Sequence, residues 1–156
     1  MKRIYSENDL KYYTYMSQVL SDLDLDNQDY WWLINDIEAY PMKKECQELI
    51  ENNSHLLLTT SELVTMLKTS DFQWIWAVFS AIPSHYEKED ILNFNLPYLT
   101  QIDDGKYNPY TDEPKLQHPY AEFEIYAADS SYMFLISDND DLVNKFKKSY
   151  PRYIEK

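Results

Sequence analysis

The side chains of this sequence that could act as a nucleophile, a base or a soft metal ligand are few and widely spaced. They are one cysteine and three histidines: Cys46, His55, His85 and His118. A catalytic cysteine needs a basic partner such as histidine, and none lies near Cys46 in the sequence. No Cys or His pair has the spacing of a zinc finger or of an HExxH motif. We therefore interpret Cys46 as a structural thiol and expect neither a metal site nor a catalytic residue here.

Carboxylates are more frequent. The run Asp22-x-Asp24-x-Asp26 resembles the start of a calcium-binding loop. In such a loop a glycine makes the turn and a glutamate closes the site, but Asn27 and Leu33 stand at those positions. The run is therefore interpreted as an acidic linker.

A second carboxylate pair, Glu122 and Glu124, falls on a predicted strand. Residues two apart on a strand share one face, and glycosidases and metal-assisted nucleases use paired carboxylates. No further Asp, Glu or His in the local pattern completes a site, so the pair is interpreted as the polar face of an amphipathic strand. An enzyme built from Glu122, Glu124, His85 or His118 would need these groups to converge in one pocket.

Glycine is almost absent, since Gly105 is the only one. A P-loop or a dinucleotide fingerprint needs several glycines, because the backbone must approach phosphates closely. A nucleophile elbow of the G-x-S-x-G type is excluded for a similar reason. We therefore expect no nucleotide cofactor, and turns that rely on Asn, Asp, Ser and Pro.

The charge is strongly acidic and unevenly spread. The formal net charge is −13, from 27 acidic and 14 basic residues. Residues 71–141 hold 14 acidic and 3 basic side chains, whereas residues 142–156 hold 1 acidic and 5 basic ones. Such charge disfavours direct binding to DNA or RNA and favours fast encounter with a basic partner.

Tyrosines are interleaved with the acidic residues of this central region: Tyr86, Tyr98, Tyr107, Tyr110, Tyr120, Tyr126 and Tyr132. Tyrosine combines a large contact area with a polar end and is enriched at interfaces. We predict a partner-binding surface made of Glu87, Glu89, Asp90, Asp103, Asp104, Tyr107, Tyr110, Asp112, Glu113, Glu122 and Glu124. The alternative is a tyrosine-rich solvated face whose charge only keeps the protein soluble.

Hydrophobic periodicity predicts the elements that must position these residues. Helices are expected over 6–21 (capped by Ser6), 42–52, 60–70 (after a Thr59–Glu62 capping box), 87–94, and after a cap at Ser137 or Asp138. Strands are expected over 30–38, 55–59, 72–82, 121–128 and 132–136, the last two joined as a hairpin at Asp129-Ser130. Residues 97–119, rich in proline, are predicted to be irregular.

The predicted architecture is α+β, with helices packed on a mostly antiparallel sheet of four or five strands, in one domain over residues 1–156. One cysteine permits no intramolecular disulfide. The sequence has no apolar run of a signal peptide and none of the roughly 18 residues that a membrane span needs. We therefore expect a cytoplasmic protein.

Three short motifs carry a resemblance: Trp31-Trp32-Leu33-Ile34, Trp74-Ile75-Trp76-Ala77 and Ala128-Asp129-Ser130-Ser131-Tyr132. With the predicted element order, they resemble an uncharacterised family from Gram-positive bacteria. In type, as a small acidic α+β protein rich in Asn, Asp, Tyr and Lys, the chain resembles bacterial immunity proteins paired with contact-dependent or other polymorphic toxins.

The resemblance to immunity proteins implies a function. Such proteins bind a cognate toxin domain, often a basic nuclease, and block its active site or substrate groove. Acidic side chains would then stand in for substrate phosphates. The alternatives are an inhibitor that mimics DNA, with carboxylates spaced like duplex phosphates, and a housekeeping domain without a special acidic site.

Overall fold

The computed structural model describes residues 1–7, 14–94 and 107–156. These residues form a seven-stranded sheet in the order β3-β2-β4-β5-β6-β1-β7, in which every neighbouring pair is antiparallel. The strands are β1 (Lys2–Glu7), β2 (Tyr30–Ala39), β3 (His55–Thr59), β4 (Trp74–Pro83), β5 (Phe123–Ala128), β6 (Tyr132–Ser137) and β7 (Ile154–Glu155). The fold is α+β as predicted, with more strands than the predicted four or five.

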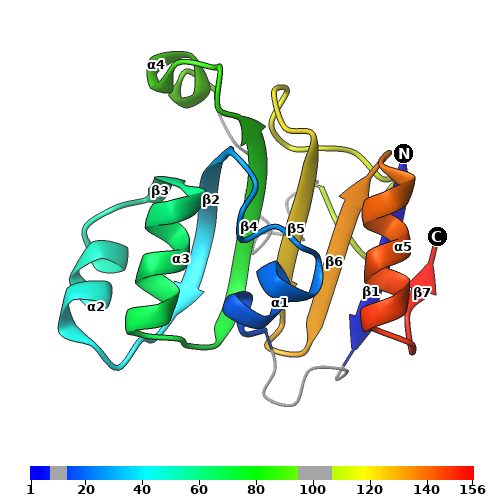
Figure 1. The fold of residues 1–156 in the computed structure, drawn as a ribbon, viewed down its shortest axis with the longest axis horizontal. Coiled ribbons are helices and arrows are strands. Elements are labelled where there is room, and N and C mark those ends of the chain that lie inside the picture. The colour runs from blue at the N-terminus through cyan, green and yellow to red at the C-terminus, as the bar shows by residue number, and fades with distance from the viewer. Residues whose placement is uncertain (8–13, 95–106) are drawn as a thin grey trace.

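Helices pack on one face of this sheet, where α1, α3 and α5 lie in front of the strands (Figure 1). The helices are α1 (Met16–Asp22), α2 (Lys44–Glu51), α3 (Thr60–Thr69), α4 (Lys88–Leu92) and α5 (Asp140–Ser149). The short helix α4 stands apart from that layer, at the end of the sheet where β4 finishes (Figure 1). Among the described residues, no helix is long and apolar enough to cross a membrane.

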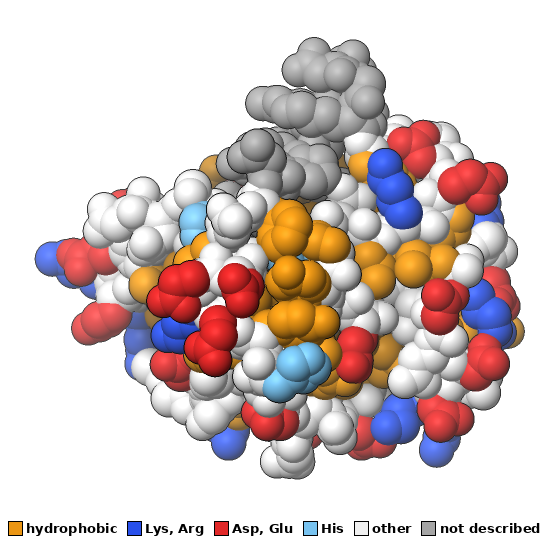
Figure 2. Space-filling model, turned by 90° about the horizontal axis from the view of Figure 1, so that it is seen from above, with side chains coloured by type: hydrophobic (Ala, Val, Ile, Leu, Met, Phe, Trp, Pro, Cys, Tyr) orange, Lys and Arg blue, Asp and Glu red, His pale blue; other side chains and the backbone are white. Residues whose placement is uncertain are grey.

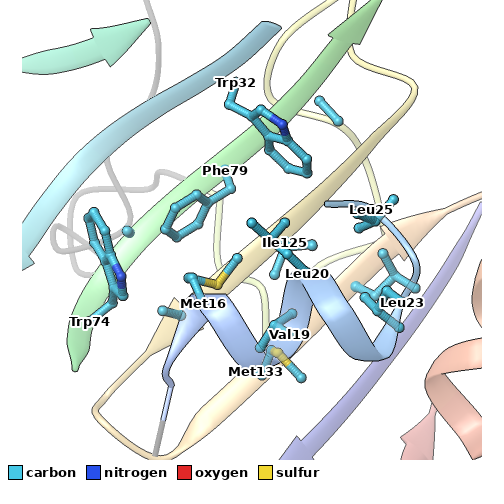
Figure 3. Close-up of a cluster of buried hydrophobic side chains, with 14 of the residues drawn as sticks. Met16, Val19, Leu20, Leu23, Leu25, Trp32, Trp74, Phe79, Ile125 and Met133 are labelled. Carbon is cyan, nitrogen blue, oxygen red and sulfur yellow. The ribbon is translucent and has the colours of Figure 1, made fainter. Parts of the chain in front are cut away.

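The main core lies between the helical layer and the sheet. Met16, Val19 and Leu20 of α1 point at Phe79 of β4 and Ile125 of β5 (Figure 3). All five side chains are at most 1% exposed. Helical spacing puts the three α1 residues on one face, and strand alternation turns every second sheet residue toward them. Apolar burial on this side therefore holds the helices to the sheet.

The opposite face of the sheet is covered by irregular chain. Tyr107, Tyr110 and Leu116 pack on Tyr126 and Phe134 in one hydrophobic cluster. A second cluster near the end of β4 joins Ile91 of α4 to residues of β2, β4 and the segment before β5. The predicted irregular region is confirmed for its described residues, 107–119. Because this segment lies on the sheet, β4 is buried on both faces, as its apolar sequence predicted.

The N-terminal helix prediction was wrong in its first part. Residues from Lys2 to Glu7 form β1, which pairs with β6 and with the short β7. Ser6, predicted as a helix cap, is a buried residue of β1. Among the described residues the helix begins at Met16, and residues 8–13 of the predicted helix lie outside them. A strand at this position depends on β6 as its neighbour, which local periodicity does not reveal.

Turn and cap chemistry explain how the chain folds with so little glycine. The β5–β6 hairpin turns through Asp129, Ser130 and Ser131, which lie between the paired Ala128 and Tyr132, and Asp129 and Ser130 adopt positive φ angles of 48° and 62°. Thr59 and Glu62 form the predicted capping box at the start of α3. The cap of α5 is Asn139, which accepts from the Leu142 N–H at 3.1 Å, and not Ser137 or Asp138. The three candidates are close in sequence, and only the backbone path selects among them.

Candidate functional site

The side chains that could do chemistry do not meet in one place. Cys46 is buried on α2, and His55 is exposed at the start of β3. His85 is exposed beyond the end of β4, whereas His118 is fully buried. Within the described residues, no group of three or more His, Cys, Asp or Glu could hold a metal ion.

The position of Glu124 corrects two predictions. Glu124 was predicted to lie on a partner-binding surface and on the solvated polar face of a strand. It is 0% exposed. Its carboxylate accepts hydrogen bonds from the hydroxyls of Ser80 at 2.8 Å and Tyr126 at 2.7 Å. It also accepts from the backbone N–H groups of Gln117 at 2.9 Å and His118 at 3.0 Å. The irregular segment buries this face, so Glu124 anchors that segment to the sheet.

Burial raises the pKa of Glu124, and the hydrogen bonds from Tyr126, Gln117, His118 and Ser80 act against that rise. All four groups are donors, so the network matches an ionised carboxylate with its lone pairs satisfied. A buried carboxylate with this many partners is a fixed structural element. It is not free to exchange protons with a substrate at the surface.

His118 extends this network to helix α4. Its Nδ1 accepts from the backbone N–H of Tyr120 at 3.1 Å. The ring therefore carries its proton on Nε2, which donates to the carbonyl of Ile91 at 2.8 Å. Burial lowers the pKa of His118. The neutral ring thus fixes α4 and the segment around Tyr120 relative to each other.

An aromatic stack is assembled where these two segments meet. We call His85, Tyr86, Tyr120 and Phe94 the aromatic ladder. The Tyr86 and Tyr120 rings stack with centroids 4.2 Å apart and an interplanar angle of 8°. The His85 ring lies 4.3 Å from the Tyr86 ring and is tilted by 32°, and Phe94 meets Tyr120 edge-on at 5.3 Å. The two tyrosines are half-buried, His85 is exposed and Phe94 is 40% exposed.

Carboxylates border the ladder. Viewed from this end of the sheet, hydrophobic side chains form a band that ends at a histidine, with acidic side chains on both sides (Figure 2). Glu87, Glu89 and Asp90 are exposed on or next to α4, and Glu122 is exposed just before β5. The ion pairs of the described residues involve none of these four.

Three contacts of this region involve charged or polar groups. The ammonium of Lys88 lies 4.9 Å from the centre of the Trp31 ring, and the Trp31 indole N–H donates to the Tyr86 carbonyl at 3.2 Å. The Tyr30 phenol donates to Glu122 at 2.8 Å. Burial, reinforced by this carboxylate, raises the pKa of Tyr30 to about 12.

The structure separates the predicted binding residues into groups. Glu87, Glu89, Asp90 and Glu122 border the ladder. Asp112 and Glu113 are exposed elsewhere, where Arg3 of β1 donates to the Asp112 carbonyl. Asp103 and Asp104 lie outside the described residues.

Two predicted tyrosines are part of the packing on the sheet. Tyr107 is only 4% exposed, which corrects its assignment to a binding surface. Tyr110 is half-buried, with its ring edge-on to Tyr132 and Phe134 at 5.3 and 5.0 Å. Both were predicted at the surface because tyrosine spacing does not report which face irregular chain covers.

Sequence reasoning missed the ladder itself. Tyr86 and Tyr120 stood out only as two of several tyrosines, while His85 and Phe94 carried no partner-binding signal. The two halves of the ladder come from segments far apart in the sequence, and their stacking depends on how the irregular segment returns to α4. No local pattern could have paired them.

One hollow of the described residues, of about 450 Å³, lies between Asp26–Asp29 and α3, away from the ladder residues. Its lining includes Asp26, Asp29 and Lys68 but neither histidine nor cysteine. It therefore offers no nucleophile–base pair of the usual kind.

No known protein family, curated protein or solved structure matches this chain.

Proposed function

We propose that this chain is an immunity protein that binds and neutralises a basic toxin domain of a bacterial polymorphic toxin system, in the cytoplasm where such a toxin would act. One observation carries the proposal: the exposed aromatic ladder lies between carboxylates that no described lysine or arginine pairs with. An apolar centre with a charged rim is the usual organisation of a protein–protein interface.

The two parts of this surface have different roles in the proposed complex. The rim carboxylates raise the rate of encounter with a basic domain, because opposite charges steer association. The rings supply the desolvated contact area that slows dissociation. If the toxin is a nuclease, Glu87, Glu89 and Asp90 take the places of substrate phosphates in its groove.

Binding accounts for the arrangement better than catalysis does. Glu124 and His118 are committed to hydrogen bonds that hold the irregular segment. His85 belongs to the exposed end of the ladder, and Glu122 is engaged by Tyr30. Glu124 and His118 thus position the ladder, Glu122 borders it, and His85 is part of it.

The test is capture of partners with the tagged chain from the bacterium that encodes it, at low and moderate salt, followed by an assay of the captured protein. We expect one stoichiometric basic toxin domain whose activity is abolished by the chain. The variant Glu87→Gln/Glu89→Gln/Asp90→Asn should weaken capture. The control Glu45→Gln/Glu48→Gln/Glu51→Gln removes the same charge from exposed positions of α2 and should capture normally.

Other results would contradict the proposal in distinct ways. Capture of a protein whose activity the chain does not inhibit would refute neutralisation. Capture of a DNA-binding protein that is not a toxin would favour the DNA-mimic alternative. Equal loss of capture in the α4 and α2 variants would show that only the overall charge matters.

A further inference from the structure

We propose that the aromatic ladder is a docking site for arginine side chains of a basic partner segment, with a preference for arginine over lysine. The inference rests on the proposed function, because it specifies what the binding surface recognises. The occupant we commit to is a basic segment that projects arginine across the ladder toward its carboxylate rims.

Charge complementarity identifies the occupant as cationic. Glu87, Glu89 and Asp90 follow Tyr86 within four residues, Glu122 follows Tyr120 by two, and all four are exposed. Lys88 is the cation within this acidic stretch, and its ammonium is directed over the Trp31 ring. A neutral or acidic segment would leave the rim carboxylates without partners when it displaced their water.

The shape and composition of the apolar centre favour arginine. His85 is the exposed end of the ladder, with Tyr86 as its ring contact among the described residues, and Phe94 is 40% exposed. Arginine can lay its stem along such partly exposed rings, and its planar, weakly hydrated guanidinium can stack on an exposed one. The same group can bind a carboxylate through two parallel hydrogen bonds, which an ammonium cannot do.

The chain itself contains a contact of the proposed kind at this place. The 4.9 Å approach of Lys88 to Trp31 is a cation held over an aromatic ring next to the ladder. Trp31 is bonded through its indole N–H to the Tyr86 carbonyl. A cation arriving at the ladder therefore lies close to an indole whose emission can report its arrival.

The experiment uses the full chain and two synthetic peptides of equal length and charge, one alternating arginine with glycine and the other alternating lysine with glycine. Binding is followed by tryptophan emission and by NMR shifts of the α4 amides at low salt. We expect the arginine peptide to bind about three- to fivefold more tightly than the lysine peptide, the ratio that an exposed cation–π contact supplies.

Variants localise the effect. Phe94→Ala and Tyr120→Leu should abolish the preference, so that the arginine and lysine peptides bind with about equal affinity. The lysine peptide should still bind. Phe94 is 40% exposed and its ring also meets the buried His118 ring at 5.0 Å, so circular dichroism verifies the fold of both variants. Glu87→Gln/Glu89→Gln/Asp90→Asn should weaken both peptides, whereas Glu45→Gln/Glu48→Gln/Glu51→Gln should weaken neither beyond its effect on net charge.

Equal affinity for the two peptides would overturn the inference, as would an arginine preference that survives both ladder variants. Shifts confined to residues distant from α4 would also overturn it. Each of these results leaves the capture experiment unaffected, because peptide selectivity requires no toxin. Conversely, an arginine preference with no captured toxin would refute neutralisation while the docking site stands.

Discussion

The carboxylate of Glu124 accepts a hydrogen bond from the backbone N–H of His118 at 3.0 Å, and both residues are fully buried. This bond joins the sheet to the irregular segment. The His118 ring then reaches α4 through the Ile91 carbonyl. The aromatic ladder is built on these two connected residues, so its geometry depends on groups that never contact a partner.

Glu124→Gln should destabilise the fold. The new amide would direct donor protons at groups that are themselves donors, and buried polar groups left without a partner cost about 1 to 3 kcal/mol. Urea denaturation measures the free energy of unfolding. The control Glu122→Gln changes an exposed carboxylate bonded to Tyr30 and should lose less than about 1 kcal/mol. Equal losses would refute the anchoring role of Glu124.

His118 should make stability fall on mild acidification. Its folded pKa is lowered from the ordinary value of 6.5, with burial as the main cause. The unfolded chain therefore takes up a proton first, and the free energy of unfolding drops as pH falls below about 6.5. Protonation would also set an Nδ1–H against the Tyr120 N–H. The His118 ring contacts the Ile91 carbonyl and the rings of Phe94 and Tyr120. Its backbone N–H donates to the carboxylate of Glu124.

The measurement for His118 is a series of urea titrations between about pH 5 and pH 8. His118→Gln should be less stable than the parent at neutral pH and should vary less with pH over this range. Glu124 acts in the opposite direction, because its raised pKa makes ionisation unfavourable in the folded chain as pH rises. The comparison between parent and variant cancels that contribution. An unchanged pH slope in the variant would contradict the prediction.

Asn139→Ala should lower stability by about 1 kcal/mol, because the Asn139 side chain accepts the Leu142 N–H at the start of α5. Asp138→Ala removes a neighbouring exposed carboxylate that pairs with the N-terminal amine at 2.8 Å. An exposed pair of this kind contributes little, so that variant should lose less than about 0.5 kcal/mol. Thermal unfolding of the two variants distinguishes the caps, and the reverse order would assign the cap to Asp138.

Lys88→Gln should strengthen binding of the arginine peptide by about twofold, since it removes a like charge from the ladder rim. The matched control is Lys68→Gln, an exposed lysine of α3 that lies away from the ladder. Both changes make the net charge more negative by one. If Lys68→Gln has the same effect, the affinity for the arginine peptide depends only on the net charge of the chain, and the local role assigned to the rim is wrong.

Local sequence features determined much of the fold. The Thr59–Glu62 capping box and the Asp129-Ser130 turn could be read directly, because each depends on residues within one turn of chain. The α+β class follows from these elements, since helices and antiparallel strands in this order must bury their apolar faces against each other.

The tertiary structure alone decided which polar residues reach solvent. Glu122 and Glu124 are two apart and look equivalent in sequence, yet one lies at the rim of the ladder and the other is sealed beneath Gln117 and His118. Periodicity predicts that a side chain shares a face with its neighbour at i+2. It cannot predict what covers that face, because the covering chain arrives from a distant part of the sequence. For the same reason the sequence determined an acidic, tyrosine-rich protein, and only the fold brought His85, Tyr86, Phe94 and Tyr120 together.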